Sequence, residues 1–224
     1  MKYLVRLEKG VITKPLLSHT DYVAENLTIN VTIPTFSSSI PLMSVNNWIV
    51  IQQNVDESVN FNRKWVDYKA GFGNTATNFW LGLEKMYQLT SSRPMQLRIE
   101  IQSLDNGKWF SAEYDTFLIN SETKGYAIHV TGYSGDAGDG LNPKVSTGIQ
   151  NGMKFSTSDK DNDKSSGFNC ANSNGGGGFW QNACCYFDLN QAQGSTYFYW
   201  HYLTDLKLAL KDQLKASRMM TKET

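Results

Sequence analysis

Carboxylates alternate with other residues in one short segment, at Asp159, Asp161 and Asp163. Ca²⁺ takes roughly six to eight oxygen ligands in a loose geometry, so a loop with acidic side chains at alternate positions suits it. An EF-hand is excluded, because Lys164 stands where that loop needs glycine and Cys170 where it needs glutamate. From the spacing alone, a calcium loop of another kind and a solvated acidic loop are equally good interpretations.

The three cysteines, Cys170, Cys184 and Cys185, lie close together in the sequence. They are too few for a disulfide-rich scaffold or for a zinc site with four protein ligands. One bridge and one remaining thiol is the simplest interpretation, and strain disfavours a bridge between the adjacent Cys184 and Cys185. No base or cation stands beside them in the sequence, so a structural bridge is favoured over a redox site. A bridge implies an oxidising compartment, although no signal-peptide core is visible in the first residues.

Residues suited to nucleophilic catalysis are scarce. The chain has three histidines, and Ser134 lacks the glycine placement of a nucleophile elbow. The sequence also holds no phosphate-binding or dinucleotide-binding glycine motif. A hydrolase that uses Ser134 and His129 is therefore the weakest hypothesis, and we expect no catalytic residue.

The overall composition narrows the class of protein. The 224 residues include 21 Lys+Arg and 21 Asp+Glu, so the formal charge is zero, which argues against nucleic acid or an anionic membrane as a partner. No apolar run approaches the roughly 20 residues of a membrane span, and neither a coiled-coil heptad array nor a collagen triplet repeat is present. With 40% hydrophobic and 12% aromatic residues, the chain folds. Its length predicts one large domain with an appendage.

Helical spacing occurs twice after residue 48. Phe61, Trp65, Tyr68 and Phe72 recur at steps of four, three and four, which predicts one face of a helix that ends at Gly71. A second, shorter helix is predicted over residues 84–89. We expect these aromatic residues to belong to the core.

Strand patterns account for most of the remaining chain. An apolar run at residues 48–51 and alternation over 95–102 predict strands, and the turn at 105–107 predicts an antiparallel return over 108–114. Two further short strands are predicted at 117–119 and 126–130. Residues 132–178 form a long glycine- and aspartate-rich region, of a length that usually carries a function.

The first 45 residues differ from the rest. Alternation over residues 27–33 predicts one strand. Asn26 and Asn30 each begin an Asn-x-Thr acceptor for glycosylation, which matters only if the chain enters the secretory pathway.

The order of the motifs resembles the fibrinogen C-terminal-like (fibrinogen-related) domain, the family of ficolin-, tachylectin- and angiopoietin-like proteins. This resemblance implies an α+β fold with a central twisted antiparallel sheet, short helices and a long loop-rich region for calcium and ligand. It extends over residues 46–222 and leaves 1–45 as a divergent N-terminal segment. The matching segments are residues 48–52, 56–65, 68–73, 79–85, 97–100, 112–114, 132–139, 151–157, 159–163, 169–171, 179–180 and 182–184.

The resemblance also assigns a calcium site to the acidic segment. It implies that Asp161 and Asp163 bind Ca²⁺ through their side chains, and that Ser165 and Gly167 bind it through their backbone carbonyls. Asp159 would lie in the outer shell.

A disulfide and a ligand pocket follow from the same resemblance. The family's bridge corresponds to Cys170 with Cys184, and the peptide bond before the second cysteine is often cis in the family. Two residues of the implied pocket depart from the family pattern, because Cys185 replaces a common histidine and Asn174 replaces an aspartate or an aromatic residue. The ligand-binding positions implied are Asn174, Ala183, Cys184, Cys185 and Tyr199.

We therefore expect a secreted, extracellular recognition domain that is supported by calcium and catalyses nothing. Its expected ligand is a carbohydrate or an acetylated group, as in lectin-like proteins of innate immunity. The alternative is a structural or protein-interaction module whose sugar pocket has decayed, motivated by Cys185 and Asn174. Its partner would then be another protein.

Overall fold

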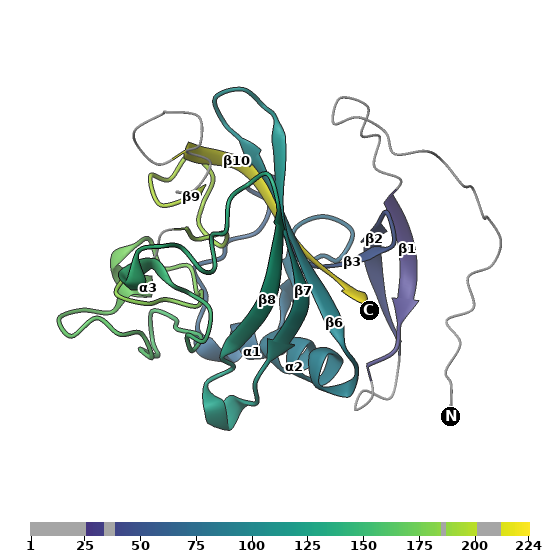
Figure 1. Cartoon of the computed structure of the whole chain (residues 1–224), viewed down its shortest axis with the longest axis horizontal. Helices are drawn as coiled ribbons and strands as arrows, with labels where there is room; N and C mark the ends of the chain where they lie inside the picture. The colour runs from purple at the N-terminus through teal and green to yellow at the C-terminus, as the bar shows by residue number, and fades with distance from the viewer. Residues whose placement is uncertain (1–25, 34–38, 185–186, 201–211) are drawn as a thin grey trace.

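The computed structural model describes residues 26–33, 39–184, 187–200 and 212–224 (Figure 1). The predictions for Cys185 and for residues 1–25 therefore lie outside the described residues. Within those ranges, no helix is long and apolar enough to cross a membrane.

One large antiparallel sheet organises the domain, and its strands run in the order β1-β2-β3-β10-β6-β7-β8. The C-terminal strand β10 lies between β3 and β6, so the last segment of the chain closes the middle of the sheet (Figure 1). A strand with neighbours on both sides is buried along most of its length, and β10 is buried at Met219, Met220 and Thr221. This architecture confirms the predicted fold class. The path strands are β1 (Asn26–Val31), β2 (Ile40–Val45), β3 (Trp48–Asn54), β6 (Met95–Ser103), β7 (Trp109–Ile119), β8 (Ile128–Gly135) and β10 (Asp212–Glu223).

Three short strands lie off this path. β4 (Phe72–Gly73) pairs with β5 (Phe79–Trp80), β5 also pairs with β3, and β9 (Tyr199–Trp200) pairs with β10.

The first helix, α1 (Trp65–Ala70), is shorter than its aromatic spacing predicted. Phe61 precedes the helix and Phe72 lies in β4, yet their rings meet edge to face with centroids 5.4 Å apart. The helix ends at Gly71 as predicted, at a backbone φ of 95°. A side chain there would lie 2.3 Å from the carbonyl oxygen of Leu81, so glycine is required. The second helix, α2 (Leu83–Ser92), extends beyond the predicted residues 84–89.

The strand β7 corrects one sequence expectation. Two strands were predicted, over 108–114 and 117–119. The strand β7 is instead continuous through the polar residues Asp115 and Thr116, because β8 pairs with it on both sides of them. Thr116 pairs with Thr131 of β8, and their hydroxyl oxygens lie 2.7 Å apart. The partner strand β8 reaches Gly135, five residues past the predicted end.

The N-terminal segment contributes two strands where the sequence predicted one. β1 and β2 form a hairpin, and β2 continues into the main sheet through the pairs Ser44 with Ile49 and Val45 with Trp48. Pro41 near the start of β2 weakened the strand signal, because proline cannot donate to a ladder. The described part of residues 1–45 is therefore joined to the sheet of the domain.

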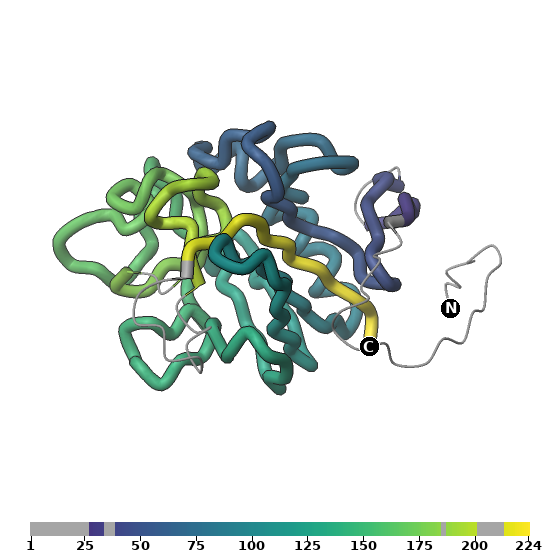
Figure 2. The backbone as a smooth tube through the Cα atoms, turned by 90° about the horizontal axis from the view of Figure 1, so that it is seen from above, coloured from purple at the N-terminus to yellow at the C-terminus, as the bar shows by residue number. Residues whose placement is uncertain are grey.

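The aromatic core lies between the sheet and the loop-rich region. The Phe155 ring packs against Tyr68, Trp80 and Trp180, with centroids 5.1, 5.6 and 5.1 Å apart. Figures 1 and 2 both place the loop-rich region, with α3 (Cys170–Ser173), at one end of the molecule and β1 at the other.

Candidate functional site

The acidic segment is curled by its own carboxylates. Asp163 accepts hydrogen bonds from two backbone N–H groups, Ser165 at 2.8 Å on Oδ1 and Cys170 at 2.7 Å on Oδ2. The backbone N–H of Asp163 in turn donates to Oδ1 of Asp161 at 3.1 Å. Partial burial and the neighbouring Asp161 carboxylate raise the pKa of Asp163 against the lowering effect of its two N–H donors. Two predicted calcium ligands are therefore adjacent carboxylates.

The oxygen donors present fit a hard cation. In the described part of the chain, neither the Ser165 nor the Gly167 carbonyl accepts a hydrogen bond from a backbone N–H. No group of three or more His, Cys, Asp or Glu side chains gathers among the described residues, so a site here would combine two carboxylates with carbonyl oxygens. That mixture of oxygen donors is typical of Ca²⁺.

Asp159 has a different position from the other two acidic residues. Its Oδ1 accepts the backbone N–H of Trp65 at 2.9 Å and the Thr157 hydroxyl at 2.8 Å, so it holds the first residue of α1. Burial pushes the pKa of Asp159 upward, but these two hydrogen bonds, a third to its own backbone N–H and the charge of Lys64 together hold the pKa below its ordinary value. The ammonium of Lys160 sits 3.7 Å from the centre of the Trp65 ring. Asp159 thus attaches the acidic segment to the helix.

The predicted disulfide is present between Cys170 and Cys184, with Cα atoms 5.4 Å apart. The Ala183–Cys184 peptide bond is cis, as the family resemblance implied. Asn169, which precedes Cys170, links α3 to the residues just before the acidic segment. Its Oδ1 caps α3 by accepting the N–H of Asn172 at 3.0 Å, and its Nδ2 donates to the carbonyl of Thr157 at 2.9 Å.

The predicted ligand residues divide into two groups. Asn174 and Cys184 are half-buried and meet through Cys170, whose carbonyl accepts the N–H of Asn174 at 3.0 Å; the neighbouring Ala183 is exposed. Tyr199 is buried in β9 opposite Gln213.

Tyr197, which sequence reasoning did not select, is half-buried and lies beside Gly175, the first residue of the glycine run 175–178. A Cβ on Gly175 would lie 3.8 Å from its ring. The alternation in the aromatic run 197–200 indicates that Tyr197 and Tyr199 share a face. That pattern does not separate the half-buried Tyr197 from the buried Tyr199.

The glycine run at 175–178 is packed against the core. The Gly178 N–H donates to the Tyr68 hydroxyl at 2.9 Å, and its carbonyl accepts Nδ2 of Asn190 at 2.8 Å. A Cβ at Gly177 would lie 2.2 Å from the carbonyl oxygen of Asn190, so no larger residue fits there. The loop beside Cys184 is therefore fixed by buried groups.

A buried acid, Asp188, supports the same loops. Its Oδ2 accepts Nε2 of Gln191 at 2.8 Å and of Gln181 at 3.1 Å, and its Oδ1 accepts the N–H of Asn190 at 2.9 Å. Complete burial raises the pKa of Asp188 to about 7, although the three donors oppose the shift. Sequence reasoning missed this residue, because its isolated position carries no motif.

The hydrolase hypothesis is contradicted by the sheet. Ser134 and His129 lie five residues apart on β8, opposite Glu113 and Leu118 respectively. At about 3.3 Å per strand residue their Cα atoms are roughly 16 Å apart, far beyond hydrogen-bond reach. His129 instead contacts Nδ2 of Asn120 at 2.8 Å.

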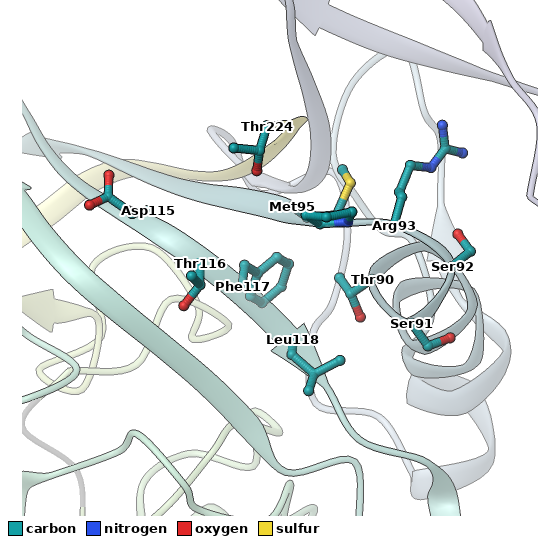
Figure 3. Close-up of a pocket in the computed structure, with 11 residues that line it drawn as sticks. Thr90, Ser91, Ser92, Arg93, Met95, Asp115, Thr116, Phe117, Leu118 and Thr224 are labelled. Carbon is teal, nitrogen blue, oxygen red and sulfur yellow. The ribbon is translucent and has the colours of Figure 1, made fainter. Parts of the chain in front are cut away.

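A separate groove of about 550 Å³ lies at the end of α2 (Figure 3). Arg93 and Met95 line one side, and Phe117 and Leu118 of β7 line the other. None of the predicted ligand or calcium residues lines it, so it is distinct from the candidate site.

The family described as the C-terminal globular domain of fibrinogen beta and gamma chains matches residues 42–207. The chain belongs to this fibrinogen C-terminal domain family. This fibrinogen-like domain is 44% identical to the Xenopus laevis fibrinogen gamma chain over 168 residues, which cover 67% of this chain and 37% of the relative. It is also 42% identical to Homo sapiens fibroleukin and 39% identical to the Drosophila melanogaster protein scabrous, and it spans 32% and 18% of the lengths of these two relatives.

Solved structures agree with this assignment. The fibrinogen-like globe domain of human ANGPTL2 superposes with a TM-score of 0.77 at 30% identity, covering 88% of this chain and 92% of that one. A lamprey fibrin D-dimer, complexed with the peptide ligand Gly-His-Arg-Pro-amide, superposes with a TM-score of 0.73 at 29% identity, covering 88% and 68%. The fibrinogen-like domain is thus a recognition or interaction module, and these matches indicate no catalytic family.

Proposed function

We propose that this fibrinogen-like domain is an extracellular, non-catalytic recognition domain that binds carbohydrate or acetylated groups with the support of Ca²⁺. The observation that carries the proposal is the hydrogen bond from the Cys170 N–H to Oδ2 of Asp163. Because Cys170 is bridged to Cys184, a cation held by Asp161 and Asp163 would act directly on the ligand loop. Ser165 and Gly167 would complete its protein ligands.

The charge at the ligand loop favours a neutral group. Asn174 is uncharged, and the acidic Asp188 is fully buried behind the glycine run. A cationic peptide end, such as the peptide in the lamprey neighbour carries, would lack an exposed acidic partner at Asn174. A neutral acetyl oxygen needs only hydrogen-bond donors, which backbone N–H groups near the half-buried Cys184 can supply.

Extracellular localisation is part of the proposal. The Cys170–Cys184 bridge supports it, because disulfides persist in oxidising compartments. Native mass mapping without reductant tests this directly. Free thiols at both Cys170 and Cys184 in the native protein, isolated from its own source, would contradict the proposed localisation.

A glycan array tests the ligand class. The wild-type domain is applied in calcium and in chelator, and we expect binding to N-acetylated sugars that chelator weakens. The variant Asp161→Ala should bind weakly in both buffers, whereas Asp159→Ala should keep the chelator response, because Asp159 contacts Thr157 and Trp65. Absence of calcium-sensitive binding to any acetylated ligand would contradict the proposal.

A protein-interaction module with a decayed sugar pocket is the second candidate. The neutral Asn174 and the cysteine at position 185 motivate it. The variant Cys185→His separates the two candidates. Acetyl-sugar binding gained only by this variant supports decay, whereas equal binding by the wild-type domain contradicts it.

A further inference from the structure

Two glycosylation acceptor sequences begin on the strand β1. Asn26-Leu27-Thr28 and Asn30-Val31-Thr32 are the only Asn-x-Ser/Thr sequences in the 224 residues. Side chains two residues apart on a strand share a face, so Thr28 and Asn30 lie on the same side of β1, and Thr32 follows directly after the strand.

That side of the strand faces solvent around Asn30. Thr28, Asn30 and Thr32 are exposed, whereas the intervening Ile29 packs against the core and Val31 is buried. The cross-strand partner of Asn30 is Pro41, which is also exposed. A bulky hydrated group on Asn30 therefore displaces no packed side chain.

We infer that Asn30 is a site of N-linked glycosylation. In that reaction Nδ2 of Asn30 forms a bond to C1 of the first N-acetylglucosamine of a polyprenyl-pyrophosphate-linked oligosaccharide. The bond from C1 to the pyrophosphate oxygen breaks, the polyprenyl pyrophosphate leaves, and Nδ2 loses one proton. The Thr32 hydroxyl completes the acceptor sequence. The inference rests on the extracellular localisation proposed above.

The position of Asn30 is compatible with ligand binding. Both views place β1 at the opposite end of the molecule from α3 and the acidic segment (Figures 1 and 2). A glycan on Asn30 would stand away from the loops around Cys184. It would also stand on the terminal strand of the sheet, which pairs only with β2 among the described residues.

Site-resolved mass spectrometry tests the inference. The full chain is directed into the secretory pathway of animal cells by an added signal sequence, and both the cell-associated pool and the medium are digested with peptide N-glycosidase in heavy-oxygen water. We expect loss of the mass of an N-glycan and heavy aspartate at position 30. Both pools are read because glycan transfer precedes folding, so a folding defect does not hide the result.

Matched variants assign the signal to the acceptor sequence. Asn30→Gln and Thr32→Ala should each lose the glycan at position 30, whereas Thr32→Ser should keep it. Thr28→Ala removes only the acceptor at Asn26 and should leave position 30 modified. Unmodified Asn30 in both wild-type pools, or a glycan confined to Asn26, would overturn the inference. These readouts are independent of ligand binding, so they can fail or succeed separately from the proposed lectin function.

Discussion

The backbone N–H of Cys170 donates a 2.7 Å hydrogen bond to Oδ2 of Asp163. This bond joins the acidic segment to the residue that is bridged to Cys184. Any change in the charge around Asp163 therefore acts on the first residue of α3 and, through the bridge, on the loop that carries Ala183 and Cys184. Cation binding and ligand binding are expected to be coupled through this amide and through the Lys164 N–H, which donates to the Asn182 carbonyl at 3.0 Å.

Replacing Asp161 by alanine should remove the calcium dependence of stability. Extracellular modules bind Ca²⁺ at about 0.1–1 mM, so at roughly 1 mM free calcium the free energy of unfolding should rise by about 0.4–1.4 kcal/mol in the wild-type domain. For a domain of this size that is a shift of a few degrees in the melting temperature. The Asp161→Ala variant should melt at the same temperature in calcium and in chelator, as measured by differential scanning calorimetry.

Asp159→Ala is the matched control for that experiment. It removes the carboxylate that accepts the Trp65 N–H at the start of α1, so it should lower the melting temperature. The loss should be similar in calcium and in chelator. An Asp161→Ala variant that still responds to chelator as the wild-type domain does would contradict the metal assignment.

Asp188 should make the domain less stable as the pH rises from about 4 to 7. Its pKa is raised by burial from an ordinary 3.8 to about 7, so the folded protein keeps a proton that the unfolded chain has already released. The contribution of protonated Asp188 to the free energy of unfolding is complete below pH 4 and is lost as the pH rises through 7. It amounts to about 1.4 kcal/mol for each unit by which the folded and unfolded pKa values differ.

The variant Asp188→Asn isolates this effect. Asparagine does not ionise, and Oε1 of Gln181, which has no partner, can turn to accept its new N–H group. Urea unfolding of both proteins at pH 5 and pH 8 should show the variant gaining stability over the wild-type domain as the pH rises. If the variant and the wild-type domain differ in free energy of unfolding by the same amount at pH 5 and at pH 8, the predicted titration of Asp188 is contradicted.

Local sequence patterns predicted the elements whose pairing is local. The alternation that became β6 and the turn at residues 105–107 fix one hairpin, and the helix cap at Gly71 follows from a backbone conformation that favours glycine. The continuity of β7 was missed, because the bonds that carry it across Asp115 come from β8. The insertion of β10 between β3 and β6 is likewise a long-range pairing that no local pattern encodes.

In the candidate site, too, some features could be predicted from the sequence and others, which depend on long-range contacts, could not. The Cys170–Cys184 bridge and the acidic segment were found from the order of motifs, which preserves a known arrangement in space. The buried support of the ligand loop was not found. Its hydrogen bonds join residues far apart in sequence, such as Gln52 with the carbonyl of Leu189 at 3.0 Å, and each residue alone resembles an ordinary surface amide.

Removing the Tyr68 hydroxyl should destabilise the ligand loop. That hydroxyl donates to the Phe61 carbonyl at 2.7 Å and accepts the Gly178 N–H at 2.9 Å, and all of these groups are buried. Tyr68→Phe leaves both partners unsatisfied, so it should lower the free energy of unfolding by about 1–3 kcal/mol. Tyr133→Phe is the control, because its hydroxyl donates to Gly135 near solvent and its loss should cost little. Equal losses in chemical denaturation would show that Tyr68 does not hold the loop.

Removing the disulfide should destabilise the whole domain and weaken ligand binding more than the loss of stability explains. The bridge closes a sequence separation of 14 residues, which is worth about 3 kcal/mol in the chain-entropy estimate. The double variant Cys170→Ser with Cys184→Ser should therefore unfold at lower urea. Below its unfolding transition it should also lose chelator-sensitive binding, because Asp163 is then connected to the ligand loop only by hydrogen bonds. Binding that stays calcium-dependent in the folded double variant would place the coupling outside the bridge.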